Sequence, residues 1–230
     1  MHISSYGQDA NQFGELRTPE GHKDRPLVVL IHGGFWRDQY HLDLMHPLCN
    51  DLCERGFATW NIEYRRVGPT GGGWYTTLLD VAAAIDHVKQ RWKSIAVVGH
   101  SAGGHLALWN ASRVDAPQPP SLTIGLAPVA DVVAANRNGT GNDATANFFG
   151  GNVDEVPERY AHAQPMPDRY TGRVVLVHGD ADINVPVEQS RAQAGQVARI
   201  EILEAVDHFA VIDPAHVSWM ITVTELEELA

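Results

Sequence analysis

The chain has 230 residues, which is long enough for one domain with a well-buried core. Hydrophobic residues make up 44% of it and charged residues 20%, the composition of a soluble globular protein. The net charge of −11 argues against nucleic acid or anionic membranes as partners, because both bind clustered Lys and Arg side chains. The N-terminal segment is polar, and no apolar run reaches the ~20 residues of a membrane span. We therefore expect a cytoplasmic protein.

Short apolar, β-branched runs alternate along the chain with longer stretches of helical periodicity. The runs predict strands at 27–31, 58–64, 95–99, 122–127, 173–179 and 199–204. Helices are predicted over 39–55, around 78–88, over 104–111 and 186–197, and after the N-cap signal Asp213-Pro214. This order predicts an α/β fold, with a mostly parallel central sheet and helices on both faces. Ligands of such sheets bind beyond the carboxyl ends of the strands.

Residues 131–170 interrupt the alternation. The segment is rich in Asn, Gly, Ala and Pro and contains no clear strand. Long segments of this kind in compact domains are usually functional or mobile. We therefore expect residues 1–230 to form a single domain, in which a small cap at about 131–170 covers the carboxyl edge of the sheet.

The two cysteines, Cys49 and Cys53, lie four residues apart on a predicted helix. Two cysteines are too few for a disulfide scaffold, so we interpret them as reduced core thiols. His46 lies nearby, but three such residues on one helix do not converge on a single ion. The sequence therefore predicts no metal site and no cofactor.

The first chemical motif is Gly99-His100-Ser101-Ala102-Gly103, between an apolar strand and a predicted helix. A nucleophilic serine on such a strained turn needs small residues on both sides, because strand and helix crowd it. The helix also points the positive end of its dipole at the serine. A glycine-rich turn can carry a serine without any chemical role, so it is the position between strand and helix that indicates catalysis.

The second motif, HGGFW at residues 32–36, follows the predicted strand 27–31 directly. Attack on a carbonyl builds negative charge on its oxygen, and preorganised backbone N–H groups stabilise that charge. Consecutive glycines let the backbone approach a ligand closely. We therefore predict that the backbone N–H groups of Gly34, Phe35 and Ala102 form an oxyanion hole.

Two acidic motifs follow the last two predicted strands. The first, HGDADINVP, carries Asp182, and the second, Asp207-His208-Phe209, carries a histidine. In a catalytic triad the histidine takes the proton of the serine, and a carboxylate holds the imidazole in the right tautomer. The chain order Ser101, Asp182, His208 is the one expected when the nucleophile lies on a strand–turn–helix elbow. Asp180 is the alternative acid.

The sequence resembles α/β-hydrolases of the carboxylesterase and arylformamidase (kynurenine formamidase-like) branch. The matching motifs are HGGFW, YRRVG, VVGHSAGGHLAL, HGDADINVP and DHF, spread over residues 27–213. The resemblance implies the α/β-hydrolase fold and a metal-free serine mechanism. It also implies Asp182 rather than Asp180 as the acid, because the family places the acid fifth in HGDAD. The related hormone-sensitive-lipase group has a third glycine where this chain has Phe35, so that group's substrates are not carried over.

Trp36 and His100 are the candidate residues of the substrate pocket. An aromatic side chain after a glycine turn, such as Phe35 or Trp36, can line an acyl or aryl pocket, but it can also pack in the core. The position of His100 inside the elbow favours a structural role over contact with substrate. Residues 64–66, Tyr-Arg-Arg, are interpreted as a brace of the oxyanion loop.

Together these motifs predict a serine hydrolase that cleaves short-chain carboxylic esters through an acyl-enzyme intermediate. Residues 131–170 are too short and polar to form a deep tunnel for a long acyl chain. The alternative is an arylformamidase that hydrolyses an aryl amide of the N-formylkynurenine type. A small peptidase and a non-catalytic ligand-binding relative are less favoured. The expected partner is a small ester or aryl amide, and the natural substrate and oligomeric state stay open.

Overall fold

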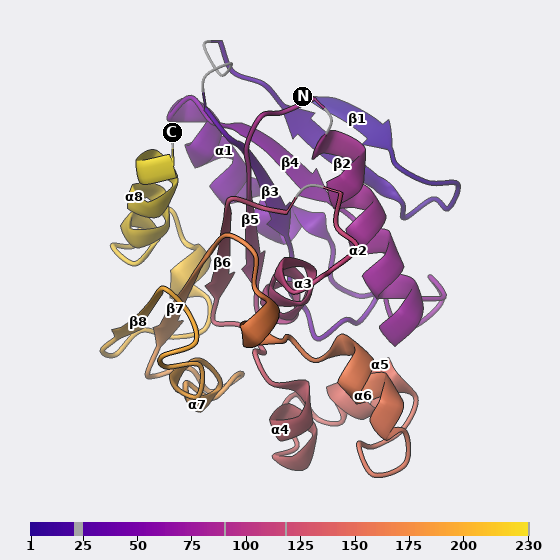
Figure 1. Cartoon of the computed structure of the whole chain (residues 1–230). Coiled ribbons are helices and arrows are strands. Elements are labelled where there is room, and N and C mark those ends of the chain that lie inside the picture. Colours follow the sequence, from indigo (N-terminus) through magenta and orange to yellow (C-terminus); the bar gives the residue numbers. More distant parts are fainter. Residues whose placement is uncertain (21–24, 90, 118, 230) are drawn as a thin grey trace.

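The computed structural model describes residues 1–20, 25–89, 91–117 and 119–229. Within them, one sheet has the strand order β1-β2-β4-β3-β5-β6-β7-β8 (Figure 1). The strands are β1 (His2–Ser5), β2 (Phe13–Arg17), β3 (Leu27–Ile31), β4 (Ala58–Ile62), β5 (Ile95–His100), β6 (Leu122–Leu126), β7 (Arg173–Gly179) and β8 (Arg199–Leu203). The helices, with 3-10 turns marked η, are η2 (Leu42–Met45), α1 (His46–Glu54), α2 (Trp74–Lys89), α3 (Ala102–Ala111), α4 (Val132–Arg137), α5 (Ala144–Phe149), α6 (Pro157–Ala163), η3 (Pro167–Arg169), α7 (Glu188–Arg191), η4 (Ala210–Ile212) and α8 (Trp219–Leu229).

The strands from β4 to β8 in sheet order all run parallel, which confirms the predicted fold class. Every residue of β3, β4, β5 and β6 is buried. Strands covered on both faces favour apolar side chains at successive positions rather than alternating ones. That is why short apolar runs in the sequence predict these strands.

Successive side chains of β3 point into two different cores. Val29 packs with the face covered by α2 and α3, where Leu106 belongs to the same cluster. Leu30 packs with the opposite face, together with Leu48 of α1 and Trp219 of α8. Because side chains of a strand alternate between the two faces of a sheet, helices on both sides are needed to bury them. Cys49 of α1 lies in the second core as a free, buried thiol.

Strands β1 and β2 were missing from the sequence prediction. They form an antiparallel pair at the edge of the sheet, and β2 also pairs antiparallel with β4. Most residues of β1 are exposed, so this strand lacks the continuous apolar run of a buried one. Its place depends on pairing with β2, which is itself held against β4 by contacts such as Leu16 opposite Trp60.

Three predicted helices are shorter than their sequence signals indicated. The one expected over 39–55 is divided into η2 and α1, which begins at His46. The helix expected over 186–197 is reduced to α7, and α8 begins at Trp219 instead of directly after Asp213-Pro214. Asp213 closes a turn instead, and its carboxylate accepts the Ala215 N–H at 2.9 Å. The burial of Trp219 in the core, rather than the cap signal at Asp213-Pro214, therefore determines where α8 begins. Among the described helices, none is long and apolar enough to cross a membrane.

The segment 131–170 forms the three short helices α4, α5 and α6 and the turn η3. In Figure 1 the three helices lie beyond the ends of the central strands, at the bottom of the view. Arg37, in the loop after β3, donates hydrogen bonds to the carbonyl oxygens of Gly141 and Asn142 at 2.7 and 2.9 Å. The segment is therefore fastened to the loop that carries the HGGFW motif.

Gly103, in the first turn of α3, has no room for a side chain. An added Cβ would lie 2.2 Å from the carbonyl oxygen of Ile31 and 2.4 Å from that of His32. Backbone atoms cannot move aside as a side chain does, so we expect Gly103→Ala to lower the free energy of unfolding by about 3 kcal/mol. For a chain of this size, the melting temperature should fall by roughly 6–12 °C.

The matched control is Gly73→Ala, where the new Cβ would meet only the Phe148 carbonyl oxygen at 3.6 Å. Its melting temperature should stay within about 2 °C of the parent, since such a contact is ordinary packing. Thermal unfolding followed by circular dichroism measures both. Equal melting temperatures for the two variants would contradict the packing argument.

Candidate active site

Ser101 occupies the turn between the end of β5 and the start of α3. Its backbone has φ 56° and ψ −119°, a conformation that residues other than glycine rarely adopt. The turn is held from both sides: the Ser101 N–H donates to the Leu126 carbonyl of β6 at 2.9 Å, and the His105 N–H donates to the Ser101 carbonyl at 3.1 Å. The strain is therefore maintained by the sheet and the helix together.

Small residues flank Ser101 because the strand and the helix almost touch there. A Cβ on Gly99, in β5, would lie 2.1 Å from the carbonyl oxygen of Gly103, in the first turn of α3. The Gly-x-Ser-x-Gly pattern thus has a direct steric reason in this fold.

The HGGFW loop after β3 passes directly over this turn. Gly34, Phe35 and Trp36 all have positive φ, at 107°, 52° and 57°. A Cβ on Gly33 would lie 2.9 Å from both the His100 carbonyl oxygen and the Ser101 Cβ, so only glycine allows this approach. Within the described residues, the backbone N–H groups of Gly34 and Phe35 donate no hydrogen bond to another protein group. Two donors therefore stay available beside the serine.

Asp182 and His208 meet on the loops that follow β7 and β8. The Nδ1 atom of His208 lies 2.6 Å from Oδ2 of Asp182. Asp180, the alternative acid, instead accepts the backbone N–H of Ala205 at 2.7 Å. Of the two candidate carboxylates, the structure brings Asp182 to the histidine.

The carboxylate of Asp182 is fixed and ionised. Its Oδ1 accepts the backbone N–H groups of Asn184 and Val185, both at 2.8 Å, and His178 Nε2 lies 3.2 Å from its Oδ2. Burial by itself raises the pKa of Asp182, but hydrogen bonds from His178 and His208 outweigh it and hold that pKa well below its ordinary value.

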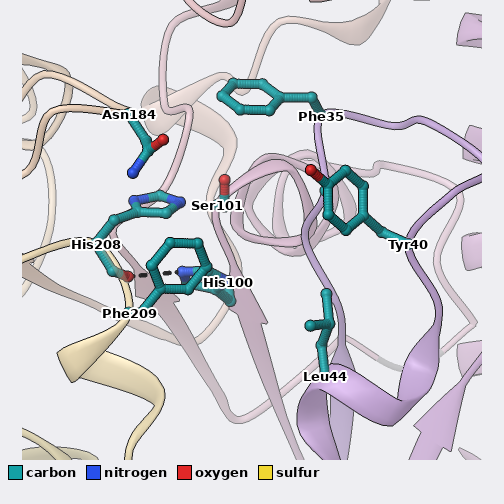
Figure 2. A pocket seen from close by; sticks show the side chains of 9 residues that line it. Phe35, Tyr40, Leu44, His100, Ser101, Asn184, His208 and Phe209 are labelled. Carbon is teal, nitrogen blue, oxygen red and sulfur yellow. Dashed lines mark hydrogen bonds between the residues drawn. The ribbon is translucent and has the colours of Figure 1, made fainter.

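The tautomer of His208 follows from its partner. Because an ionised carboxylate only accepts hydrogen bonds, Nδ1 of His208 must carry the proton that faces Asp182. Its Nε2 is then free to accept a proton. In Figure 2 the hydroxyl of Ser101 lies beside the His208 ring. The arrangement has the parts of a nucleophile, a base and an orienting acid.

His178 is a functional candidate that the sequence reading missed. Its Nε2 contacts Asp182, and its Nδ1 lies 2.8 Å from the Ser190 hydroxyl. The Asp182 carboxylate and the Val185 carbonyl oxygen, which lies 3.0 Å from Nε2, are both acceptors, so Nε2 of His178 carries a proton. The signal was present, because His178 is the first residue of the HGDAD motif.

A pocket of about 80 Å³ opens in front of the serine. Its lining residues are Gly34, Phe35, Tyr40, Leu44, His100, Ser101, Asn184, His208 and Phe209 (Figure 2). Figure 2 shows two walls: Phe35, Tyr40 and Leu44 lie on one side of Ser101, and His208 with its neighbours lies on the other. The first wall is mostly apolar.

The two predicted pocket residues have different places. His100 lines the pocket. Trp36 does not: it is buried in the core, stacked on Phe148 with ring centroids 4.7 Å apart and edge-on to His105. Its neighbour Phe35 lines the pocket instead. Our assignment of Trp36 to the pocket is therefore corrected.

His100 connects the serine turn to the base. Its Nε2 lies 3.0 Å from the carbonyl oxygen of His208, and the two rings are 4.6 Å apart. Burial, together with the nearby His208, lowers the pKa of His100 to about 3, so the ring is neutral and donates to that carbonyl. The contact holds the His208 loop against the end of β5.

A buried polar network underlies the HGGFW loop. The Tyr64 hydroxyl donates to the His32 carbonyl oxygen at 2.8 Å, and the two rings stack with centroids 4.4 Å apart. Glu63 accepts from His32 Nε2 at 2.9 Å and forms an ion pair with Arg66. Tyr64 and Arg66 thus brace the loop, as predicted for residues 64–66, whereas Arg65 pairs with Asp80 at 2.7 Å.

Metal ligands do not gather at this site. In the described ranges there is no group of three or more His, Cys, Asp or Glu side chains that could hold an ion.

A family model, BD-FAE, matches residues 15–196. The chain belongs to the BD-FAE family of α/β-hydrolases. It is 26% identical over 243 residues to Esterase LipC of Mycobacterium tuberculosis, an alignment that covers 91% of this chain and 60% of LipC. The chain therefore spans less than two thirds of that relative.

Solved structures share the fold of this chain at low identity. A bifunctional GH43-CE protein of Bacteroides eggerthii superposes with a TM-score of 0.80 and 18% identity, over 99% of this chain and 37% of that one. Esterase 2 of Thermogutta terrifontis superposes with a TM-score of 0.76 and 19% identity, over 99% of this chain and 92% of that one. At such identities the likeness establishes the fold alone.

Two buried histidines make the stability of this BD-FAE protein depend on pH. Burial lowers the pKa of His100 to about 3 and that of His105 to about 4. In the unfolded chain each takes a proton below about pH 6.5. Unfolding therefore binds protons between about pH 6.5 and 4, and the free energy of unfolding should decrease as the pH is lowered through this window.

Replacing one of these histidines should flatten the dependence. His105→Gln can still donate to the Ala163 carbonyl, which the ring contacts at 2.8 Å. We expect the slope of unfolding free energy against pH to drop by roughly 1.4 kcal/mol per unit, one proton's worth. Urea denaturation at about pH 7, 6 and 5 measures it, with exposed His2→Gln as the control. An identical slope in His105→Gln and the parent would contradict the assignment.

Proposed function

We propose that this protein is a serine esterase that cleaves short-chain carboxylic esters through an acyl-enzyme intermediate. The observation that carries the proposal is the contact of 2.6 Å between Asp182 and His208, beside a serine held at positive φ. A buried ionised carboxylate on the far side of the imidazole gives the base its tautomer and stabilises the imidazolium that forms during reaction. A strained Ser101 beside this pair is in the position that a nucleophile needs.

In the acylation step, the Ser101 Oγ attacks the ester carbonyl carbon while His208 Nε2 takes the hydroxyl proton. The carbonyl π bond opens, and its electron pair becomes the oxyanion. The N–H groups of Gly34, Phe35 and Ala102 donate to this oxygen. Within the described residues the first two donate to no other protein group, so neither has to break a hydrogen bond to bind this oxygen.

The tetrahedral intermediate then collapses. The bond to the leaving oxygen breaks, and His208 gives its proton to that oxygen, so that a neutral alcohol departs. Water repeats the sequence on the acyl-enzyme: it loses a proton to His208, attacks the carbonyl carbon, and Ser101 leaves with the proton returned. The products are the alcohol and the carboxylic acid.

The size of the pocket favours short acyl groups. Its volume of about 80 Å³ is small beside the roughly 300–1,000 Å³ of typical ligand pockets. Among the solved structures of similar fold, Thermogutta terrifontis esterase 2 is described with propionate and with butyrate bound, and phosphonylated by sarin. Short carboxylic acids and a serine-directed agent suit the chemistry proposed here.

Segment 131–170 acts in this proposal as a small cap. Phe35 extends toward it, since a Cβ on Gly141 would lie 2.3 Å from the Phe35 ring. The cap thus supports one wall of the pocket. No observation favours the arylformamidase alternative over ester hydrolysis. Hydrolysis of N-formylkynurenine by the purified protein would test that alternative directly.

Substitutions in the proposed triad should abolish turnover. Ser101→Ala and His208→Ala should each lower kcat by about 10⁶, and the double variant should be little worse, because the groups act as a unit. Asp182→Asn should cost about 10⁴. Hydrolysis of p-nitrophenyl acetate measures the loss, and a fluorophosphonate probe should label Ser101 in the parent.

Asp180→Asn is the matched control, because the Asp180 carboxylate contacts the Ala205 N–H and not His208. Its kcat should stay within a few-fold of the parent. Should Asp180→Asn prove more damaging than Asp182→Asn, the acid would be misassigned. Full activity in Ser101→Ala would refute the serine mechanism.

Chain length is the second test of the proposed function. We expect kcat/KM for p-nitrophenyl esters to be highest from acetate to butyrate and at least roughly tenfold lower at octanoate, ~1.4 kcal/mol in the barrier. Leu44→Ala, which shortens one wall of the pocket, should move the optimum toward longer chains. A profile that still rises at octanoate would contradict the small acyl pocket and leave the triad untouched.

A further inference from the structure

Tyr40 follows the HGGFW loop and packs directly on it. A Cβ on Gly34 would lie 2.4 Å from the Tyr40 Cβ, so the Tyr40 side chain packs against the Gly34 backbone. The Tyr40 N–H donates to the Arg37 carbonyl at 3.3 Å, which closes a turn around the loop. The phenol is therefore positioned by the same residues that carry the proposed oxyanion donors.

The Tyr40 hydroxyl is the polar group of an apolar wall. The side chain is half-buried and lines the pocket beside Phe35 and Leu44. Figure 2 shows its oxygen pointing toward Ser101, from the side opposite His208. Within the described residues, no hydrogen bond joins this hydroxyl to another protein group. A hydroxyl in such surroundings gains most when a polar atom of the substrate becomes its partner.

The chemistry of attack identifies that partner. His208 approaches Ser101 from one side and must reach both the serine oxygen and the leaving oxygen. The carbonyl oxygen therefore turns to the other side, toward the Gly34–Phe35 loop. Tyr40 packs against that loop and lies on the same side of Ser101 (Figure 2).

We propose that the Tyr40 hydroxyl donates a hydrogen bond to the oxyanion of the tetrahedral intermediate, beside the backbone N–H groups. The inference rests on the proposed esterase function and adds a side-chain donor to it. The hydrogen bond strengthens as charge develops on the oxygen, so it stabilises the transition state more than the bound ester. The phenol keeps its own proton throughout, and no bond to Tyr40 forms or breaks.

The test is Tyr40→Phe, which keeps the ring and removes only the donor. Loss of one oxyanion donor typically costs 10²–10³ in kcat, and with three backbone donors remaining we expect about 100-fold. KM for p-nitrophenyl acetate should stay within about twofold. An alkyl boronic acid or a trifluoromethyl ketone, which forms a tetrahedral adduct with Ser101, should lose affinity by a similar factor.

Tyr75→Phe is the matched control, because Tyr75 is a 53% exposed tyrosine outside the pocket. Its kinetics should equal those of the parent. The melting temperature of Tyr40→Phe should stay within about 2 °C, which separates a lost donor from a disturbed fold. If kcat and inhibitor affinity were unchanged, or if only KM rose, the role of Tyr40 would be refuted.

The two variants distinguish a failure of the esterase mechanism from a failure of the Tyr40 assignment. If Ser101→Ala keeps full activity, the proposed esterase mechanism itself is wrong. If Ser101→Ala is inactive while Tyr40→Phe keeps its kcat and its affinity for the boronic acid, only the Tyr40 assignment is overturned.

Discussion

Close contact between the ends of β3 and β5 is the constraint on which the whole site depends. Three glycines make it possible: Gly33 passes against Ser101, Gly99 faces Gly103, and Gly103 faces the last carbonyls of β3. At each, a single methyl group would collide with backbone atoms. The contact forces Ser101 into a positive φ. It also brings the HGGFW loop, with its backbone N–H groups, close to the serine. The close packing of the strand ends and the approach of the HGGFW loop to Ser101 therefore both require glycine at these positions.

Burial has opposite consequences for the charges around this contact. Asp182 stays ionised in the interior because two backbone N–H groups and two histidines surround its carboxylate. His100 stays neutral because burial lowers its pKa to about 3. A neutral His100 suits its position 4.6 Å from the His208 ring, since a second positive charge there would oppose protonation of the base. Solvent exclusion thus fixes which groups can carry charge during a reaction.

The HGGFW loop is where the separate parts of the chain are joined. From below, Tyr64 and Glu63 hold His32 through hydrogen bonds of 2.8 and 2.9 Å. From outside, the 131–170 segment contacts Phe35 and accepts hydrogen bonds from Arg37. A loop with three successive positive φ values would not hold this shape without such support. The shape of the pocket is consequently set by residues far apart in the sequence.

The sequence by itself determined the elements whose signals are local. Continuous apolar runs identified the buried parallel strands, and the motifs after them identified Ser101, Asp182 and His208 as candidates, because parallel strands bring their carboxyl ends to one edge. The tertiary structure decided what depends on contacts between distant segments. It paired β1 and β2 at the edge, started α8 at Trp219, turned Trp36 into the core and brought Tyr40 and His178 to the site. A periodic pattern in the sequence indicates which side chains are buried. A strained backbone and a close approach of two loops leave no such periodic pattern. The directions of the Trp36, Tyr40 and His178 side chains are therefore fixed only in the folded chain.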